Sequence, residues 1–558
     1  MKKVILILCL ALPALMPASA ALRTESEALR LAEQFVASKH TFSAMPAHSL
    51  KLAKTYTMPQ LQQPAMYVFN AQDAFVIVSA VEADEPILAY SNESAFELDN
   101  MPGHIRMWMN RYAAEAQWIG QHPKYAPEGM DKSYEPVNAI CRARWNQDVP
   151  YNDLCPYDGG GHCYTGCVAT AAAIVMYAYK HPATGVGSYS YLWLPNGETQ
   201  TETLSADFGA TTYQWDKMSD AMYGSDEDDE RNAIATLMYH CGVSANMAYG
   251  SDGSGTQSEY MYRSLYTYFR YDKAIRVLGL DYNRDTAFLN YVNYELLQGR
   301  PMLMSGATKS QEGHAFVLDG MDEEGKVHIN WGWGGMSNGM FTIRCLDPES
   351  QGAGGAASGE AFTERVKIAC GIRPDQGGMR VPSLGVDVLK AKLDEGDIEF
   401  TSSHVTNLSP DEWTGRYGIL IYRDGVLVRV MNEGNKTSIP VQETGANIGK
   451  FYFWQEDFDL PDGQYRITIG ARYEDADTWY PLLVRGQGEK KWDLIVEDGD
   501  ISIVENLQDD PISEPVHMAL ETVSSNEHMQ SAKVMRDGRI LIRQGDYLFD
   551  LLGNRVEK

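Results

Sequence analysis

The chain has 558 residues, 44% of them hydrophobic and 11% aromatic, so it can bury sizeable cores and is not disordered as a whole. This length predicts roughly three or four domains rather than one core. Its 75 acidic and 47 basic residues give a formal net charge of −28. Such a surface repels phosphate backbones, which argues against nucleic acid as a partner.

The first 20 residues predict a secretory signal peptide. Two lysines precede an apolar run at 4–15, and the small residues ASA follow at 18–20. The apolar run is too short to span a membrane, and no later run reaches the roughly 18 apolar residues of a transmembrane helix. We therefore expect a secreted or cell-surface protein without a transmembrane segment.

Residues 21–140 mix helical and extended patterns. Apolar residues recur at helical spacing at 25–38 and 103–119, and short strands are predicted at 66–69 and 75–78. The section has no cysteine and no glycine-rich loop. It is predicted to be a small α+β module.

Residues 141–374 hold the seven cysteines that follow the leader: 141, 155, 163, 167, 241, 345 and 370. An odd number in an exported protein leaves at least one thiol outside intramolecular disulfides. Helices are predicted first, at 167–180, 227–241, 258–269 and 285–298. Strands follow at 302–304, 314–318, 327–331 and 339–343. This order indicates an α+β domain with a seam between a helical half and a strand half.

The rest of the chain is predicted to be β-rich. After a linker-like stretch at 374–378, alternating runs separated by Asp-Gly turns predict an antiparallel β-sandwich over 380–497. The tail, 500–558, is polar until the apolar runs 539–543 and 547–553, which predict a small terminal hairpin.

Cys167 is the candidate nucleophile. Gly166 precedes it and an alanine-rich helix follows, so the thiol is predicted at a helix N-terminus, where unpaired N–H groups lower a cysteine pKa. Cys163 is a rival, but it lies in the preceding loop and has Cys155 nearby as a disulfide partner.

A metal cluster is the second rival interpretation of this stretch. It would use Cys155, His162, Cys163 and Cys167, but no second ligand pair recurs downstream at the usual spacing. We therefore expect no metal site.

His314 is the candidate base for the thiol. It follows Gly313 at the start of an apolar strand, and the next strand runs into NWGWGG at 330–335. A hairpin between the two strands sets His314 opposite Trp333, with Trp331 diagonal on the same face and Asn330 on the other. The indoles would exclude water from the imidazole. Upstream, the Gln147 amide is a candidate oxyanion donor beside the Cys167 N–H.

The segments TGCVAT at 165–170, GHAFV at 313–317 and NWGWGG at 330–335 resemble the streptopain family of papain-like cysteine peptidases. The resemblance covers about 141–374. It implies a papain-like fold of two subdomains, with Cys167 as nucleophile and His314 as general base and then acid. Trp331 takes the place of the asparagine of papain-like enzymes, which implies a Cys-His dyad and leaves Asn330 a minor candidate for orienting His314.

The resemblance also implies roles for neighbouring residues. Gln147 is similar to the oxyanion glutamine, and the loop 249–255 resembles the substrate-binding loop, with Ser254 or Gly255 contacting the peptide. Gly313 is similar to the glycine whose backbone binds substrate beside the histidine, and Trp333 is a further candidate at that position.

The family makes its enzymes as zymogens, and the section 21–140 resembles the inhibitory propeptide in position and length. Cleavage is then expected near 125–145. The run 547–556 resembles the end of C-terminal domains that direct outer-membrane secretion.

The expected function is a secreted cysteine endopeptidase that cleaves polypeptides, needs no metal or organic cofactor, and is inhibited by its own propeptide. Two alternatives stay open from the residues alone. One is an adhesin in which the peptidase is a relic and the sandwich binds host surfaces. The other is a papain-like amidase that acts on cell-wall peptides.

Overall fold

A computed structural model describes residues 20–42, 49–99, 101–123, 133–222, 227–282, 285–307, 313–344, 366–394, 396–453 and 460–505, and four short strands beyond residue 530. The chain divides into two compact units, Met1–Pro515 and Val516–Lys558. The predicted signal peptide (apart from Ala20), Cys345 and part of the expected cleavage region fall outside the described residues. Within the described residues no helix is long and apolar enough to cross a membrane.

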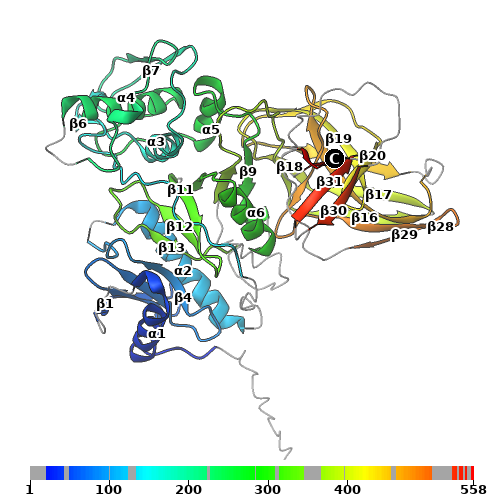
Figure 1. Cartoon of the computed structure of the whole chain (residues 1–558), viewed down its shortest axis with the longest axis horizontal. Helices are drawn as coiled ribbons and strands as arrows, with labels where there is room; N and C mark the ends of the chain where they lie inside the picture. Colours follow the sequence, from blue (N-terminus) through cyan, green and yellow to red (C-terminus); the bar gives the residue numbers. More distant parts are fainter. Residues whose placement is uncertain are drawn as a thin grey trace, which may run out of the picture. The chain divides into compact units, whose positions relative to one another are not determined.

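The N-terminal segment (residues 20–123) is a four-stranded sheet between two helices, as predicted for a small α+β module. Thr24 and Glu27 form a capping box at the start of the first helix. The first helix covers one face of the sheet and the second covers the other (Figure 1). The elements are α1 (Glu25–Ser38), β1 (Lys51–Thr57), β2 (Pro64–Asn70), β3 (Phe75–Ser79), β4 (Ile87–Ser91) and α2 (Gly103–Gln121).

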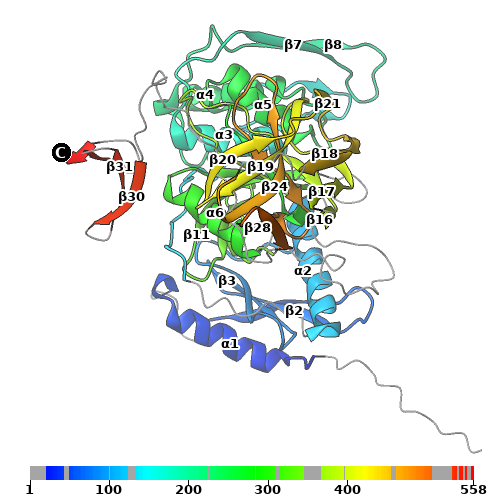
Figure 2. The ribbon, with the colours of Figure 1, turned by 90° about the vertical axis from the view of Figure 1, so that its right-hand side faces the viewer.

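The central segment (residues 133–374) begins with a helical part. Its helices are α3 (Cys167–Tyr179), α4 (Asp228–Ser244), α5 (Ser258–Tyr268) and α6 (Asp285–Leu297). Two hairpins accompany them, β5 (Tyr157–Asp158) with β6 (Gly161–His162), and β7 (Ser188–Trp193) with β8 (Glu202–Asp207), the second of which runs beside α4 (Figure 2). The predicted helices are confirmed, with ends shifted by at most three residues.

The strand half of the central segment joins the N-terminal segment in one ten-stranded sheet, in the order β1-β2-β3-β4-β13-β12-β11-β10-β14-β9. The joint is the antiparallel pair of β4 with β13, in which Tyr90 faces Met340 and Ala89 faces Phe341. The central strands are β9 (Arg276–Gly279), β10 (Met302–Ala307), β11 (Gly313–Met321), β12 (Val327–Asn330), β13 (Gly339–Phe341) and β14 (Lys367–Cys370).

The β-rich region (residues 380–505) contains three sheets around one core. The strand pairs described in it are antiparallel, as predicted, except β15 with β26, which is parallel. Its strands are β15 (Leu384–Val386), β16 (Leu389–Asp394), β17 (Asp397–Ser402), β18 (His404–Asn407), β19 (Trp413–Arg423), β20 (Val426–Met431), β21 (Thr437–Ile439), β22 (Thr444–Asn447), β23 (Lys450–Phe453), β24 (Gly463–Tyr473), β25 (Tyr480–Pro481), β26 (Leu483–Val484), β27 (Gly488–Glu489), β28 (Trp492–Glu497) and β29 (Asp500–Glu505).

The second unit contains a four-stranded antiparallel sheet where the sequence predicted a hairpin. Its strands are β30 (Ser531–Arg536), β31 (Arg539–Gln544), β32 (Tyr547–Phe549) and β33 (Arg555–Glu557). The two predicted apolar runs fall on β31 and β32, which pair with each other.

Candidate active site

Cys167 is the first residue of α3, as the sequence predicts. Its N-cap, Gly166, has a φ of 85°, a conformation that side chains other than glycine rarely adopt. A Cβ on Gly166 would also lie 2.8 Å from the Met247 side chain and 3.1 Å from the Ser254 carbonyl oxygen. Glycine is therefore required here both by conformation and by space, and it lets a second loop approach the thiol.

Three backbone N–H groups surround the sulfur of Cys167. The Ala315 N–H donates to Sγ at 3.4 Å, and the N–H groups of Val168 and Cys167 also lower the pKa of the thiol. Burial is the larger effect, since Cys167 is 7% exposed, and it raises the pKa above its ordinary value. The sequence predicted that the helix N-terminus would lower this pKa, but in this structure the burial of the thiol outweighs the N–H groups and the direction is upward.

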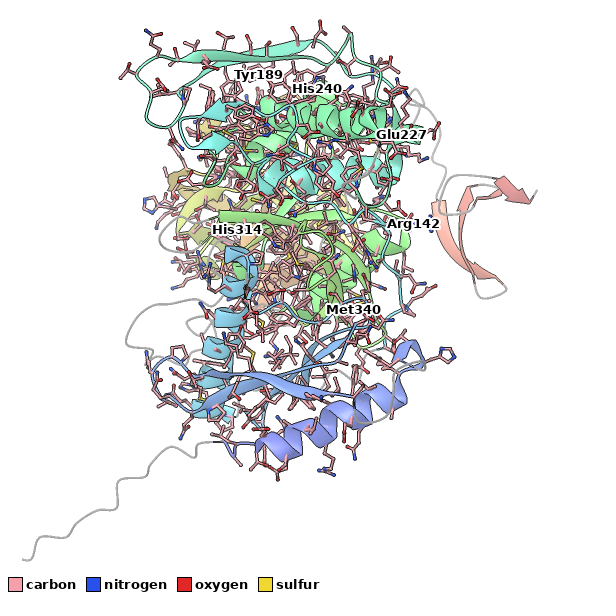
Figure 3. The ribbon with its side chains drawn as sticks, turned by 90° about the vertical axis from the view of Figure 1, so that its left-hand side faces the viewer. Arg142, Tyr189, Glu227, His240, His314 and Met340 are labelled. Carbon is pink, nitrogen blue, oxygen red and sulfur yellow. The ribbon has the colours of Figure 1, made fainter. Side chains whose placement is uncertain are left out.

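His314 lies at the start of β11, next to the residue whose N–H reaches the sulfur. It faces Gly306 across the β10–β11 pair and is half-buried. Alternate residues of β11 point to opposite faces. Ala315 and Val317 join the core that contains α3, and Phe316 and Leu318 join the core that contains α2. Figure 3 labels His314 between the helical part and the N-terminal segment.

The two tryptophans lie beside β11 on the side of the N-terminal segment. The β11–β12 pairing, with Val317 opposite Asn330, has the predicted register, but β12 ends at Asn330 and the ladder does not reach Trp333. Trp331 is fully buried and its ring centroid lies 4.8 Å from that of Phe316 and 6.1 Å from that of Trp108 on α2. Trp333 is half-buried against the same core. Trp331 thus joins the histidine strand to the N-terminal segment.

Asn330 lies on the other side of the strand. Its Nδ2 donates to the Ala143 carbonyl at 2.7 Å, and its Oδ1 accepts from the Gly332 N–H at 3.1 Å. These bonds fix the chain before the nucleophile and the turn after β12. The suggestion that Asn330 orients His314 therefore has no support from its contacts.

Gln147 is brought beside the nucleophile loop through its backbone. Its carbonyl accepts from the Thr165 N–H at 3.0 Å, two residues before Cys167, and the residue is 9% exposed. Two residues upstream, the Trp145 carbonyl accepts from the Gly334 N–H at 2.9 Å. The segment 145–147 therefore joins the nucleophile loop to the turn that follows Trp333.

The loop 249–255 packs against the residues just before Cys167. The Ser254 hydroxyl donates to the Tyr164 carbonyl at 2.6 Å, and the Tyr164 N–H donates to Gly250 at 3.2 Å. Gly255 exchanges two backbone hydrogen bonds with Ala248. The Ser254 hydroxyl and the Gly255 backbone thus already have partners, and their predicted contact with peptide stays a prediction, as does that of Gly313, which is exposed.

Cys155 and Cys163, the suggested disulfide pair, are both free thiols, as are all six described cysteines. Burial raises the pKa of Cys163 to about 12 and raises that of Cys155 further. In the described part of the chain, no group of three or more His, Cys, Asp or Glu side chains is arranged to hold a metal ion.

A buried ionic cluster around His328 was not predicted from the sequence. His328 Nδ1 lies 2.5 Å from Asp319 Oδ1, and its Nε2 lies 3.2 Å from Glu93 of the N-terminal segment. Burial opposes the charge, but both carboxylates favour it, and the pKa of His328 is raised to about 10. In the sequence, the cluster is indicated only by two polar residues within apolar strands, Asp319 and His328. Nothing in the sequence near Glu93 indicates that it joins them.

The comparisons with known proteins agree with this geometry. Residues 145–341 match the model of the peptidase C10 family, and residues 20–116 match that of the Spi protease inhibitor. Streptopain of Streptococcus pyogenes is 30% identical over 375 residues, which cover 63% of this chain and 92% of streptopain. The chain belongs to the peptidase C10 family. The resemblance to streptopain and the papain-like fold class are thereby confirmed, and the protein is a cysteine peptidase with an inhibitor-type N-terminal segment.

Two further relatives are similar over comparable stretches. Thiol protease/hemagglutinin PrtT of Porphyromonas gingivalis is 31% identical over 379 residues, and the match spans 63% of this chain but only 42% of PrtT. A solved prointerpain A fragment of Prevotella intermedia is 32% identical, with a TM-score of 0.49. The match covers 58% of this chain and 98% of the fragment.

Proposed function

We propose that this C10 peptidase is a secreted endopeptidase made as a zymogen, with Cys167 as nucleophile and His314 as its base. The observation that carries the proposal is the hydrogen bond from Ala315 N–H to Cys167 Sγ, at 3.4 Å. It supports the pairing because the strand that carries His314 touches the sulfur. The alternation of β11 sets the His314 side chain on the opposite face from Ala315, so in the proposed reaction the imidazole turns toward Sγ. The three backbone N–H groups around Sγ favour a thiolate once water reaches it.

In the proposed reaction the Cys167 thiolate attacks the substrate carbonyl and forms a C–S bond. The tetrahedral oxyanion is stabilised by the Cys167 N–H and by the Gln147 side chain, whose backbone lies beside the nucleophile loop. Protonated His314 gives its proton to the leaving amine as the C–N bond breaks. The neutral imidazole then takes a proton from water, which attacks the acyl group and releases the thiolate.

The N-terminal segment is the proposed intramolecular inhibitor. It extends the sheet that carries His314, and its Trp108 packs on both Trp331 and Phe316. Cleavage within the predicted stretch 125–145 would separate it from the nucleophile. The domain limits 21–140, 141–374, 380–497 and 500–558 are part of this proposal.

Labelling with a thiol-directed inhibitor tests the nucleophile, with Cys163 as a matched control four residues away. Cys167→Ala should abolish labelling, casein cleavage and self-maturation, while Cys163→Ala should keep all three. Retained casein cleavage in folded Cys167→Ala would refute the assignment. Hydrolysis of murein peptides without casein cleavage would favour an amidase instead, and no hydrolysis by any processed form would favour an adhesin.

N-terminal sequencing of the exported protein tests the remaining parts. The wild type should begin between residues 125 and 145, whereas Cys167→Ala should begin near residue 21. Wild-type protein that keeps its N-terminal segment while fully active would contradict the zymogen.

A further inference from the structure

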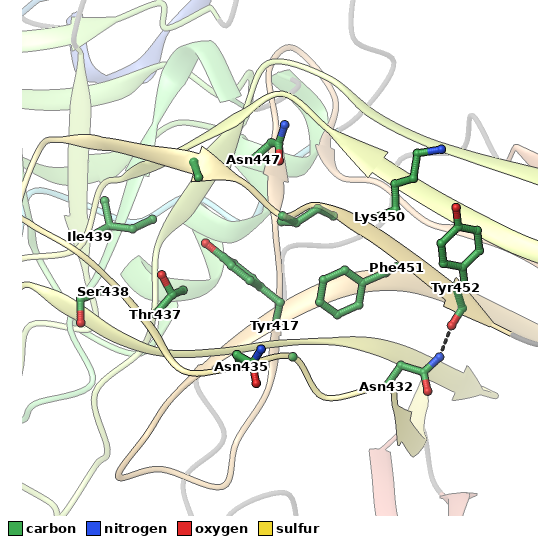
Figure 4. A pocket seen from close by; sticks show the side chains of 13 residues that line it. Tyr417, Asn432, Asn435, Thr437, Ser438, Ile439, Asn447, Lys450, Phe451 and Tyr452 are labelled. Carbon is green, nitrogen blue, oxygen red and sulfur yellow. Dashed lines mark hydrogen bonds between the residues drawn. The ribbon is translucent and has the colours of Figure 1, made fainter.

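A cavity of about 500 Å³ opens in the β-rich region, away from the peptidase residues. It lies where β19 and β21, which are paired with each other, face β22 and β23 from the neighbouring sheets. Figure 4 shows the lining side chains, among them Tyr417, Phe451 and Asn435. Sites of this volume accommodate small ligands.

The cavity has a buried floor and a polar rim. Its floor is made by Tyr417, Ile439 and Ile448, which are 6%, 2% and 7% exposed. The rim carries exposed amide and hydroxyl side chains, namely Asn432, Asn435, Ser438 and Asn447. A concave site with an apolar floor and few polar groups at its edge is the usual form of a small-molecule site.

A polar group at the floor lacks a partner. The Tyr417 side chain points into the cavity (Figure 4), and its hydroxyl has no hydrogen-bond partner among the described residues. The side chains of Asn435 and Thr437 likewise have none within that part of the chain. The Tyr417 ring is buried but its hydroxyl is open to the cavity, since it is not among the buried unpaired atoms of the described residues, so water or a ligand group can bond to it there.

The charge of the lining restricts that ligand. Among the described residues that line the cavity there is no carboxylate and one cation, Lys450, which lies 3.0 Å from Glu399. A charged ligand would therefore find no free opposite charge, whereas hydroxyl groups would find donors and acceptors in the three asparagine amides. The rings of Tyr417 and Phe451 supply an apolar surface for the C–H face of a sugar ring.

We propose that this cavity binds a neutral saccharide. A sugar ring would lie against Phe451 and Tyr417, with its hydroxyls bonded to the Tyr417 hydroxyl and to the amides of Asn435 and Asn447. The site would attach the peptidase to glycans on its substrates or on a cell surface. It is independent of Cys167, so the proposed peptidase activity and this binding can fail separately.

The test uses the full chain with Cys167→Ala, which prevents self-cleavage. Its binding to an array of neutral and acidic glycans is measured first, and maltotriose, cellotriose and chitotriose are then titrated by calorimetry. We expect binding of at least one neutral glycan. Tyr417→Phe, which removes one hydroxyl, should weaken it about fivefold, and Asn435→Ala on the exposed rim should weaken it by a similar factor.

Tyr465→Phe is the matched control. Tyr465 lies on β24, the strand next to β19, its hydroxyl donates to the Pro461 carbonyl, and it does not line the cavity. It should leave binding unchanged. The proposal is overturned if no neutral glycan binds at millimolar concentration, if both cavity variants bind as well as the parent, or if only peptides bind.

Discussion

The peptidase segment has two interfaces with the rest of the first unit, and they are built differently. The N-terminal segment is attached by strand addition, β4 on β13, and by acidic side chains that surround Arg344. The β-rich region is attached through two ion pairs. Arg276 Nη2 lies 3.0 Å from Glu489 Oε1, with both side chains 0% exposed, and the partly exposed Arg485 guanidinium pairs with Asp281.

The ionic contacts of the two interfaces also differ in their arrangement. Arg344 shares its charge among Asp84, Glu85 and Glu115, and Lys39 and His328 add contacts to acids at the edge. The Arg344, Asp84 and Glu115 side chains are 4%, 1% and 0% exposed, and separation of the two segments would return these charges to water. Arg276 also lies over the Tyr480 ring, 5.7 Å from its centroid, and its pair is closed on all sides. Since the N-terminal segment is the part that we propose is released, the first interface is called the separable interface below.

Removing one member of the closed pair should have the largest effect. Glu489→Ala leaves the buried Arg276 guanidinium without its carboxylate, and we expect the free energy of unfolding to fall by about 3–5 kcal/mol. Urea unfolding of the variants in the Cys167→Ala background measures this free energy. The double variant Arg276→Met with Glu489→Leu should recover part of the loss, because it removes both charges of the pair, while Lys491, which lies 3.6 Å from Glu489 Oε2, still loses its carboxylate. A loss as large in the double variant would contradict this account.

Arg344→Met should open the other interface. It removes the buried cation nearest to Asp84, while Glu115, whose pKa is already raised by burial, keeps only Arg111, at 2.7 Å. We expect the interface to weaken by about 2–4 kcal/mol. Hydrogen exchange on the full chain should show faster exchange in β4 and α2 and unchanged exchange in β26 and β27. Equal acceleration in the β-rich region would mean that the variant acts by general destabilisation.

Local patterns predicted the parts of the site that lie within one stretch of chain. The glycine before Cys167, the alanine-rich run and the apolar strand after His314 each determine their own element, and α3 and β11 are confirmed. The interfaces could not be predicted in this way. The pairing of β4 with β13 joins residues some 250 positions apart, and Arg344 gives no sign in sequence of the acids that surround it. The thiol pKa also depended on burial by distant residues, which no local pattern records.

Gly339 offers a steric test that affects only the separable interface. A Cβ at this position would lie 2.5 Å from the Tyr90 carbonyl oxygen and 2.8 Å from Ser91 Cβ, and the third neighbour, Phe75, is also in the N-terminal segment. Gly339→Ala should therefore weaken docking of the N-terminal segment by about 1–3 kcal/mol. We expect the full-length form to mature faster, and gel electrophoresis over time measures this rate. The matured enzyme should keep its kcat/KM, and a loss there would show that the methyl group disturbs the peptidase itself.

A pH dependence of the stability is also expected from His328. Its pKa is about 10 in the folded protein, where Asp319 and Glu93 favour the charged ring, against an ordinary value of 6.5. A raised folded pKa contributes stability that is fully present below pH 6.5 and is lost as the pH rises through about 10. The unfolding constant should therefore rise between these values by up to about tenfold per pH unit from this group. Urea unfolding at several pH values measures the slope, which His328→Gln should flatten.

Substitution of Glu93 tests whether the charge on His328 stabilises the contact with the N-terminal segment. Glu93→Gln keeps the shape of the side chain but removes the one carboxylate that reaches His328 from the N-terminal segment. The pH dependence of the unfolding constant should then decrease only in part, because Asp319 remains 2.5 Å from the His328 ring. Between pH 7 and 10 the variant should also exchange amide hydrogens faster in β4 than the parent does. If Glu93→Gln leaves both slope and exchange unchanged, the charge on His328 belongs to the peptidase core alone and does not help to hold the separable interface.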